Sequence, residues 1–168
     1  ALVHDLVVLG QTSPQSSDAG GMASDFVQTV VIDSGRPALV VPYIGAPAEI
    51  GKRVMVAWKA TREAARALTA AIPFMKHAAE VQVVTFGDEP SSGVVAYLAS
   101  HGIHAKTHTE PHQPERDVGD LLLSQATDLE ADLLVMGCFG HSRAREWILG
   151  GATRTLLQSM TIPVLMAH

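Results

Sequence analysis

The 168-residue sequence has little cysteine and no long apolar run. Its single cysteine, Cys138, cannot form a disulfide within the chain. No apolar stretch approaches the roughly 18 residues that a membrane-spanning helix needs, and the first residues do not resemble a secretory leader. We therefore expect a soluble, cytoplasmic protein with no membrane partner.

Positive charge is scarce as well. The chain has 12 Lys and Arg against 17 Asp and Glu, which gives a formal net charge of -5. The basic residues are spread thinly, so they form no patch that could hold a nucleic-acid backbone. Nucleic acid is therefore not an expected partner.

From Lys52 onward, short apolar runs alternate with segments of helical period. This pattern is typical of parallel strands joined by crossover helices. The polar third strand is expected at the sheet edge, and the wholly apolar fourth strand at its centre. The fold class is therefore α/β, a doubly wound five-stranded parallel sheet with helices on both faces. The expected strands are 53–58, 81–86, 105–109, 133–136 and 163–167, and the expected helices follow Thr61, span 92–100, follow Asp117 and span 152–159.

Two of these helices carry start signals. Thr61 is placed to cap the first, and Pro73 is expected to kink or end it. Asp117 is placed to start the third. The buried stripe expected on that third helix consists of Val118, Leu121, Leu122, Ala126 and Leu129.

Residues 1–42 repeat the end of this pattern. The segment HDLVVLG at 4–10 matches ADLLVMG at 131–137, and RPALVVP at 36–42 matches IPVLMAH at 162–168. Matches at similar separation indicate a duplication. The expected units are the end of a first, truncated domain (1–42), a linker (43–51) and a complete domain (52–168).

Four glycines follow the apolar fourth strand: Gly137, Gly140, Gly150 and Gly151. In an open parallel sheet, ligands bind beyond the carboxyl ends of the strands, where the crossover direction reverses. Glycine there lets the backbone approach a phosphate closely. The alternative is that these glycines form tight turns in which a helix packs closely on a strand. The spacing by itself leaves both interpretations open.

The spacing resembles the signature of the universal stress protein family. That signature is glycine, two residues, glycine, nine residues, glycine, then serine or threonine, after a strand that ends in Met-Gly. Met136-Gly137, Gly140 and Gly150 reproduce it up to the last place. The resemblance covers residues 52–168 as a whole domain and 1–42 as the tail of another, and many family members are similar tandem chains.

The resemblance implies an adenine nucleotide alpha hydrolase-like, or Rossmann-like, sheet of strand order 3-2-1-4-5. It also implies that ATP, with Mg, binds where the order reverses, with its phosphates on the glycine loop and its adenine near the end of the second strand. Carried over by position, the candidate nucleotide-binding residues are Ala57, Trp58, Lys59, Thr61, Phe86, Met136, Gly137, Gly140, His141, Ser142, Gly150, Gly151 and Ala152.

The chain departs from the family pattern at two of these positions. Gly151 stands where the family has serine or threonine, which removes one hydroxyl donor. Lys59 stands where the family often has an acidic residue, and an ammonium cannot accept a hydrogen bond from a ribose. Lys59 can either meet a phosphate or lie in solvent, and Trp58 can either cover the adenine or close the strand end.

Other chemistry is weakly supported. The segment 140–144, GHSRA, partly resembles a nucleophile elbow but lacks its final glycine. Four histidines at 101, 104, 108 and 112 could bind zinc, but they run from a helix end across a strand into a loop, so they share no helical face. Cys138 lies near helix starts, which favours a thiolate, and is otherwise a small loop side chain.

These observations predict a non-catalytic module of the stress response that binds ATP or a related nucleotide. The alternative is a dimerising scaffold that needs no nucleotide, and a weak ATPase is a third, less supported reading. In the family the edges of the final strands pair, within a tandem chain or between subunits, and we expect a homodimer or larger homo-oligomer through Ala38–Val41 and Val164–Ala167. No metal site is expected apart from the magnesium that ATP carries.

Overall fold

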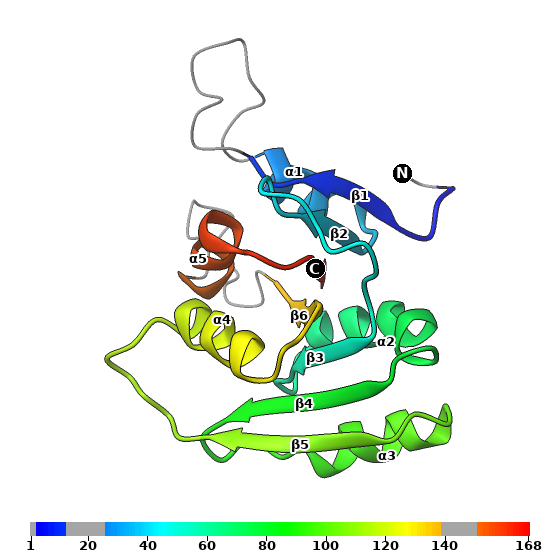
Figure 1. The fold of residues 1–168 in the computed structure, drawn as a ribbon, viewed down its shortest axis with the longest axis vertical. Helices are drawn as coiled ribbons and strands as arrows, with labels where there is room; N and C mark the ends of the chain where they lie inside the picture. Colours follow the sequence, from blue (N-terminus) through cyan, green and yellow to red (C-terminus); the bar gives the residue numbers. More distant parts are fainter. Residues whose placement is uncertain (1–2, 13–25, 139–150) are drawn as a thin grey trace.

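The computed structural model describes residues 3–12, 26–138 and 151–168. These residues form one seven-stranded sheet with helices on both faces (Figure 1). The strands are β1 (Val7–Gly10), β2 (Ala38–Val41), β3 (Arg53–Ala57), β4 (Glu80–Phe86), β5 (Ala105–Glu110), β6 (Leu133–Gly137) and β7 (Val164–Ala167). The helices are α1 (Phe26–Ser34), α2 (Arg62–Met75), α3 (Ser92–Ser100), α4 (Val118–Asp128) and α5 (Gly151–Ser159).

The strands lie side by side in the order β1-β2-β7-β6-β3-β4-β5. Neighbouring strands are parallel except for β2 and β7. The expectation of a five-stranded sheet is corrected, because β1 and β2 extend the same sheet to seven strands. If β3 is counted as the first strand and β7 as the fifth, these five strands lie in the order 3-2-1-4-5. The polar strand β5 lies at an edge of the sheet, and the apolar strand β6 lies inside it.

Helix α2 begins where the sequence predicts, but it continues past its proline. The Ala64 N–H donates to Thr61 Oγ1 at 3.2 Å, so Thr61 caps the helix as predicted. The buried side of the helix includes Leu68 and Met75. Pro73 does not end the helix, which continues to Met75.

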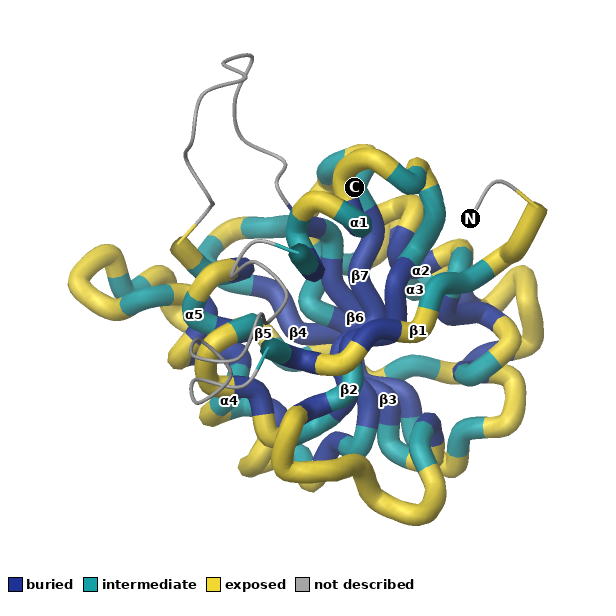
Figure 2. Tube along the Cα trace, turned by 90° about the horizontal axis from the view of Figure 1, so that it is seen from above, coloured by how far each residue is buried: buried dark blue, intermediate teal, exposed yellow. Residues whose placement is uncertain are grey.

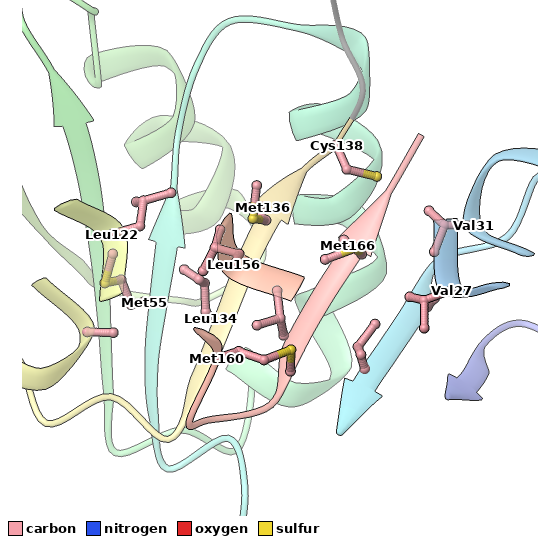
Figure 3. Packing of buried hydrophobic residues seen from close by; sticks show 14 of the residues in the cluster. Val27, Val31, Met55, Leu122, Leu134, Met136, Cys138, Leu156, Met160 and Met166 are labelled. Atoms are coloured by element: carbon pink, nitrogen blue, oxygen red, sulfur yellow. The ribbon is translucent and has the colours of Figure 1, made fainter. Parts of the chain in front are cut away.

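Each face of the sheet has its own core. On one face, α2 and α3 pack against apolar side chains of the central strands, among them Val56, Val83 and Val135. On the other face lie α1, α4 and α5, and Figure 3 shows Leu122 of α4, Leu156 of α5 and Met160, which follows α5, over the sheet. Val27 and Val31 of α1 extend this second core beside Met166 of β7. Figure 2 shows burial concentrated along the central strands.

The matching sequence segments form two strand pairs that can be compared residue by residue. Val7 pairs with Ala38 in the β1–β2 ladder, and the equivalent residues Leu134 and Val164 pair in the β6–β7 ladder. The flanking hydrogen bonds agree: the Val7 N–H donates to the Pro37 carbonyl, and the Leu134 N–H donates to the Pro163 carbonyl, both at 3.0 Å. The two strand pairs therefore have the same register.

The two equivalent final strands, β2 and β7, pair antiparallel within the chain. Each already has a parallel neighbour on its other side, so among the described strands neither has an open edge. Pairing within one chain is one of the two arrangements that the family resemblance implies for these edges. The homodimer or larger homo-oligomer stays a prediction.

Candidate functional site

The predicted site lies where β3 and β6 meet at their carboxyl ends. Ala57, the last residue of β3, is the register partner of Met136. Helix α2 follows β3 on one face, and α5 follows β6 in the chain and packs on the other face. The crossover direction therefore reverses here, and this is the position at which open parallel sheets bind ligands.

Gly137 packs directly against the start of α2. A Cβ on Gly137 would lie 2.4 Å from the Ala64 backbone nitrogen and 2.7 Å from the Glu63 carbonyl carbon. Such a distance is impossible without moving the helix. At Gly137 the close-packing interpretation of the glycines is therefore the one that the structure supports, because the glycine makes room for a helix.

The loop after β3 has many of its backbone donors engaged. The Trp58 N–H donates to the Val84 carbonyl at 2.9 Å, and the Thr61 N–H donates to the Lys59 carbonyl at 2.7 Å. The Ala60 N–H donates to Glu89 Oε1 at 2.8 Å. The Glu89 carboxylate therefore already accepts one of the backbone donors of this loop.

A second carboxylate lies at the positive end of α2. The pKa of Glu63 is below its ordinary value, mainly because the carboxylate accepts a hydrogen bond from its own backbone N–H, with desolvation opposing this. A negative charge at this position stabilises the helix start. A bound anion at α2 would have to compete with it.

The large apolar candidates Trp58, Phe86 and Met136 lie on opposite faces of the sheet. Trp58 is half-buried against the α2–α3 core, which supports its role in closing the strand end. Phe86 packs on the opposite face of the sheet, against the α4–α5 core. Met136 is 6% exposed in that same core. Trp58 and Phe86 therefore do not face each other across a common base-binding slot.

The start of α5 packs closely on α4. Gly119 is buried, and a Cβ on it would lie 2.7 Å from the carbonyl oxygen of Ala152. Val118, expected in the buried stripe of α4, is 40% exposed instead. Gly119 takes the buried position because only a residue without a side chain lets the two helices approach this closely.

Asp117 connects this contact to the candidate site. Its Oδ1 accepts hydrogen bonds from the Gly119 N–H at 2.7 Å and the Asp120 N–H at 3.4 Å, which caps α4. Its Oδ2 lies 3.0 Å from the place a Cβ on Gly151 would occupy. The glycine at 151 therefore leaves room for the carboxylate, which stands beside the first residue of α5.

Four candidates, Gly140, His141, Ser142 and Gly150, lie outside the described residues. Of the others, Ala57, Gly137 and Thr61 lie around the meeting point of β3, β6 and α2. Lys59 is exposed on the loop between them. The side chains of Phe86 and Met136 belong to the core beneath α4 and α5, and Trp58 packs on the other core. Gly151 and Ala152 lie at the start of α5, beside Asp117 and Gly119.

Cys138 is a buried residue that directly follows β6. It is 2% exposed, and its backbone N–H donates to the Ala167 carbonyl at 3.0 Å. Burial raises the pKa of the thiol far above its ordinary value, and the negative charge of Glu63 adds to the rise. The protonated thiol is a poor nucleophile and a poor metal ligand, which favours a structural role.

The histidines do not gather into a metal site. Among the described residues, no group of three or more His, Cys, Asp or Glu side chains is arranged to hold a metal ion. His108 pairs with the buried Gln82 at 2.7 Å, and the His101 ring lies edge-on to Tyr97. These contacts account for two of the four histidines.

A shallow hollow of about 350 Å³ lies at the other end of the sheet, at the start of β3, β4 and β5. Its charges are paired: Glu80 binds Arg53 at 3.1 Å and Lys106 at 2.5 Å. Arg53 also binds Glu130 at 2.8 Å. A site whose charges already neutralise one another has little left to attract a charged ligand.

Comparison with known proteins supports the family resemblance for part of the chain. The model of the family described as "Universal stress protein family" matches residues 98–168, which is less than half of the sequence. The matched segment contains β5, α4, β6, α5 and β7, and so includes the glycine-rich half of the candidate site. No curated protein is significantly similar to the chain.

Solved structures of universal stress proteins share the fold. One from Archaeoglobus fulgidus DSM 4304 has a TM-score of 0.73 at 18% identity over 98% of this chain, which spans 62% of the length of that protein. Another from Archaeoglobus fulgidus has a TM-score of 0.54 at 19% identity, over 67% of this chain and 95% of its own. The structural similarity to the first of these proteins extends over nearly the whole of the present chain, including β1 and β2.

In the described residues, no helix is long and apolar enough to cross a membrane.

Two features of the candidate site were not expected from the sequence. They are the Asp117–Gly151 contact and the Glu89–Ala60 hydrogen bond. The helix-start pattern marked Asp117 only as a cap, and no local pattern singled out Glu89.

Proposed function

We propose that the chain is a universal stress protein that acts as a non-catalytic regulatory module of the stress response. In this proposal, ATP or a related nucleotide, accompanied by Mg, binds beyond the carboxyl ends of β3 and β6. The observation that carries the proposal is the reversal at Ala57 and Met136, directly followed by the glycine spacing of the matched family segment.

The described residues fit this ligand only in part. The N–H groups of Trp58, Ala60 and Thr61 already have acceptors, and Gly137 packs on α2. Donors for the phosphates would therefore have to come largely from residues 139–150. When bound, the magnesium would neutralise phosphate charge, which matters beside carboxylates such as Asp117 and Glu63.

Two observations favour the alternative, a scaffold that needs no nucleotide. Glu89 occupies the Ala60 N–H, and Asp117 stands at the start of α5, so carboxylates already hold positions that an anion would use. In that case the module acts only through its association with other chains. We do not expect turnover of ATP in either case, and a weak ATPase would be detected as phosphate release above background.

Thermal unfolding with and without millimolar Mg-ATP tests the nucleotide proposal. A ligand that binds only the folded state at about 100 times its Kd stabilises it by roughly 2.7 kcal/mol. We expect a rise in Tm with Mg-ATP and a smaller one with inorganic triphosphate. If Mg-ATP leaves the Tm unchanged, the nucleotide proposal fails and the scaffold stands.

Lys59→Glu separates the two interpretations of this side chain. If the ammonium meets a phosphate, the variant loses much of the ATP-induced rise in Tm. If Lys59 is a solvated loop residue, the rise is unchanged. Lys76→Glu, which changes a lysine at the far end of α2, serves as the control for net charge.

We further propose that residues 1–42 are the end of a first, truncated domain of the same type, with 43–51 as linker and 52–168 as a complete domain. The equal registers of the β1–β2 and β6–β7 pairs support this. A homo-oligomer stays part of the proposal, through surfaces other than the paired edges of β2 and β7. We expect the protein in the cytoplasm.

A further inference from the structure

Equivalent residues of the two repeats differ in what they contact, and the difference begins at Asp5 and Asp132. The Asp132 carboxylate accepts three backbone N–H groups at the start of β3: Gly51 at 2.7 Å, Lys52 at 3.0 Å and Arg53 at 3.1 Å. Asp5 is exposed, and within the described part of the chain its carboxylate accepts no hydrogen bond. The same carboxylate therefore holds a neighbouring strand in one repeat and is exposed to solvent in the other.

The second difference concerns a valine. Val135 of β6 is fully buried in the core beneath α2. Val8 is its equivalent on β1, and it is 63% exposed. Burying an exposed valine side chain contributes about 1.5 to 3 kcal/mol, so Val8 is a favourable place for an apolar partner.

The third difference concerns a glycine. Gly137 makes room for the first turn of α2, whose Ala64 nitrogen would lie 2.4 Å from a Cβ at this position. Gly10 is its equivalent, and a Cβ there would meet nothing within 4 Å. The space that a helix start fills at β6 is therefore open at β1.

The two outer edges of the sheet also differ in character. The edge strand β5 carries Lys106, His108 and Glu110, which are side chains that discourage further strand pairing. The edge strand β1 reads VVLG and carries no charge. Only the β1 edge is therefore suited to accept another strand.

We infer that the surface formed by Asp5, Val8, Gly10 and the open edge of β1 binds a strand–helix segment equivalent to Gly51–Met75. The incoming strand would pair parallel to β1, as β3 pairs with β6. Asp5 would accept the N–H groups at its start, and its helix would cover Val8 and pack on Gly10. This inference rests on the proposed tandem arrangement and not on nucleotide binding.

The segment must come from polypeptide additional to these 168 residues. A second copy cannot supply it without loss, because its own Gly51–Met75 is already bound to Asp132, Val135 and Gly137 of the same chain. Donating it would open the same gap at β6. The similar Archaeoglobus fulgidus DSM 4304 protein does have additional chain, since the present one spans 62% of its length.

Thiol labelling of Val8→Cys tests this. One protein is the 168-residue chain, and the other is an extended chain in which a second copy of residues 51–130 is placed before His4, the equivalent of Ala131. Residues 51–130 contain no cysteine, and the native Cys138 is 2% exposed, so it serves as the slow reference. Val135→Cys is the matched buried control in both proteins.

In the 168-residue chain we expect rapid labelling of Val8→Cys. In the extended chain we expect it to slow by a factor on the order of 100, toward the rate of Val135→Cys, because labelling would then require local opening. Adding Asp5→Asn to the extended chain should bring back part of the rapid labelling of Val8→Cys.

Equal and rapid labelling of Val8→Cys in both proteins would show that the added residues do not dock on β1. This result would overturn the inference. Slow labelling already in the 168-residue chain, together with a dimer in sedimentation, would also overturn it and identify a second copy as the occupant. The labelling needs no nucleotide, so its failure is distinct from the failure of the ATP experiment.

Discussion

Leu39 of β2 and Leu165 of β7 lie opposite each other at the centre of the antiparallel pair that joins the two repeats. They occupy the same position of the repeat, and their neighbours pair symmetrically, Ala38 with Met166 and Val40 with Val164. The contact is therefore the kind that two identical subunits make across a two-fold axis, formed here within one chain.

Replacing either leucine with alanine should destabilise the protein. Leu39 is 6% exposed and Leu165 is fully buried in the same core, so each substitution should lower the free energy of unfolding by about 2 to 5 kcal/mol, with the larger loss at Leu165. Urea unfolding measures this. Val8→Ala is the control and should change little, and an unchanged midpoint for Leu39→Ala would contradict the β2–β7 pairing.

Gly137→Ala should destabilise the protein, whereas Gly10→Ala should leave its stability nearly unchanged. A methyl group at 137 would overlap the backbone of α2, so we expect a loss of about 1 to 3 kcal/mol or more. At Gly10 the space is open, so the change in stability should stay within about 0.5 kcal/mol. Both are read from urea unfolding. Equal effects would show that the glycine at 137 is not needed for packing.

Asp132→Ala and Asp5→Ala form a second matched pair. The first removes the acceptor of three backbone N–H groups, and hydrogen bonds to charged groups contribute about 1.5 to 3 kcal/mol each. Because water can replace some of them, we expect a net loss of about 2 to 3 kcal/mol. Asp5→Ala should be neutral in the 168-residue chain. Amide hydrogen exchange at Lys52 and Arg53 gives a local readout, and unchanged protection there would contradict the contact.

Much of the fold could be predicted from the sequence, because its local signals agree with one another. The alternation of apolar runs and helical periods placed every element from β3 to β7, and the Thr61 and Asp117 caps placed two helix starts. The polar composition of β5 identified an edge strand because an edge must be shielded. The match of HDLVVLG with ADLLVMG identified the repeat.

The sequence could not predict contacts between segments that are distant in the chain. Gly119 has no side chain to mark it, yet its contact with Ala152 sets the distance between two helices. Glu89 lies between two elements, and only the fold brings it to the Ala60 N–H. The antiparallel pairing of β2 with β7 joins two strands that lie more than one hundred residues apart in the chain, and only the fold shows that both strands come from the same chain.

Glu80 makes part of the stability depend on pH. Its pKa is lowered from an ordinary 4.5, mainly because Lys106 donates a hydrogen bond to the carboxylate, with desolvation opposing this. A carboxyl with a lowered folded-state pKa stabilises the fold above its unfolded pKa. This stabilisation is lost as the pH falls through the lower, folded value. In Glu80→Gln, the fall in Tm below about pH 4.5 should be slightly less steep than in the original protein. Lys106→Met should have the same effect. An unchanged profile in both variants would contradict the pairing.

Gly119→Ala tests the close contact between α4 and α5. Alanine is the better helix former by up to about 1 kcal/mol, but its methyl group would lie 2.7 Å from the Ala152 carbonyl oxygen and 2.8 Å from Thr155 Cβ. The overlap should outweigh the propensity, for a net loss of about 1 to 3 kcal/mol. Gly93 of α3 is the control, since a Cβ there meets nothing within 4 Å and Gly93→Ala should stabilise by about 0.5 kcal/mol. If both variants are stabilised in urea unfolding, the two helices do not approach as closely as the structure shows, and Asp117 would then no longer be held beside Gly151.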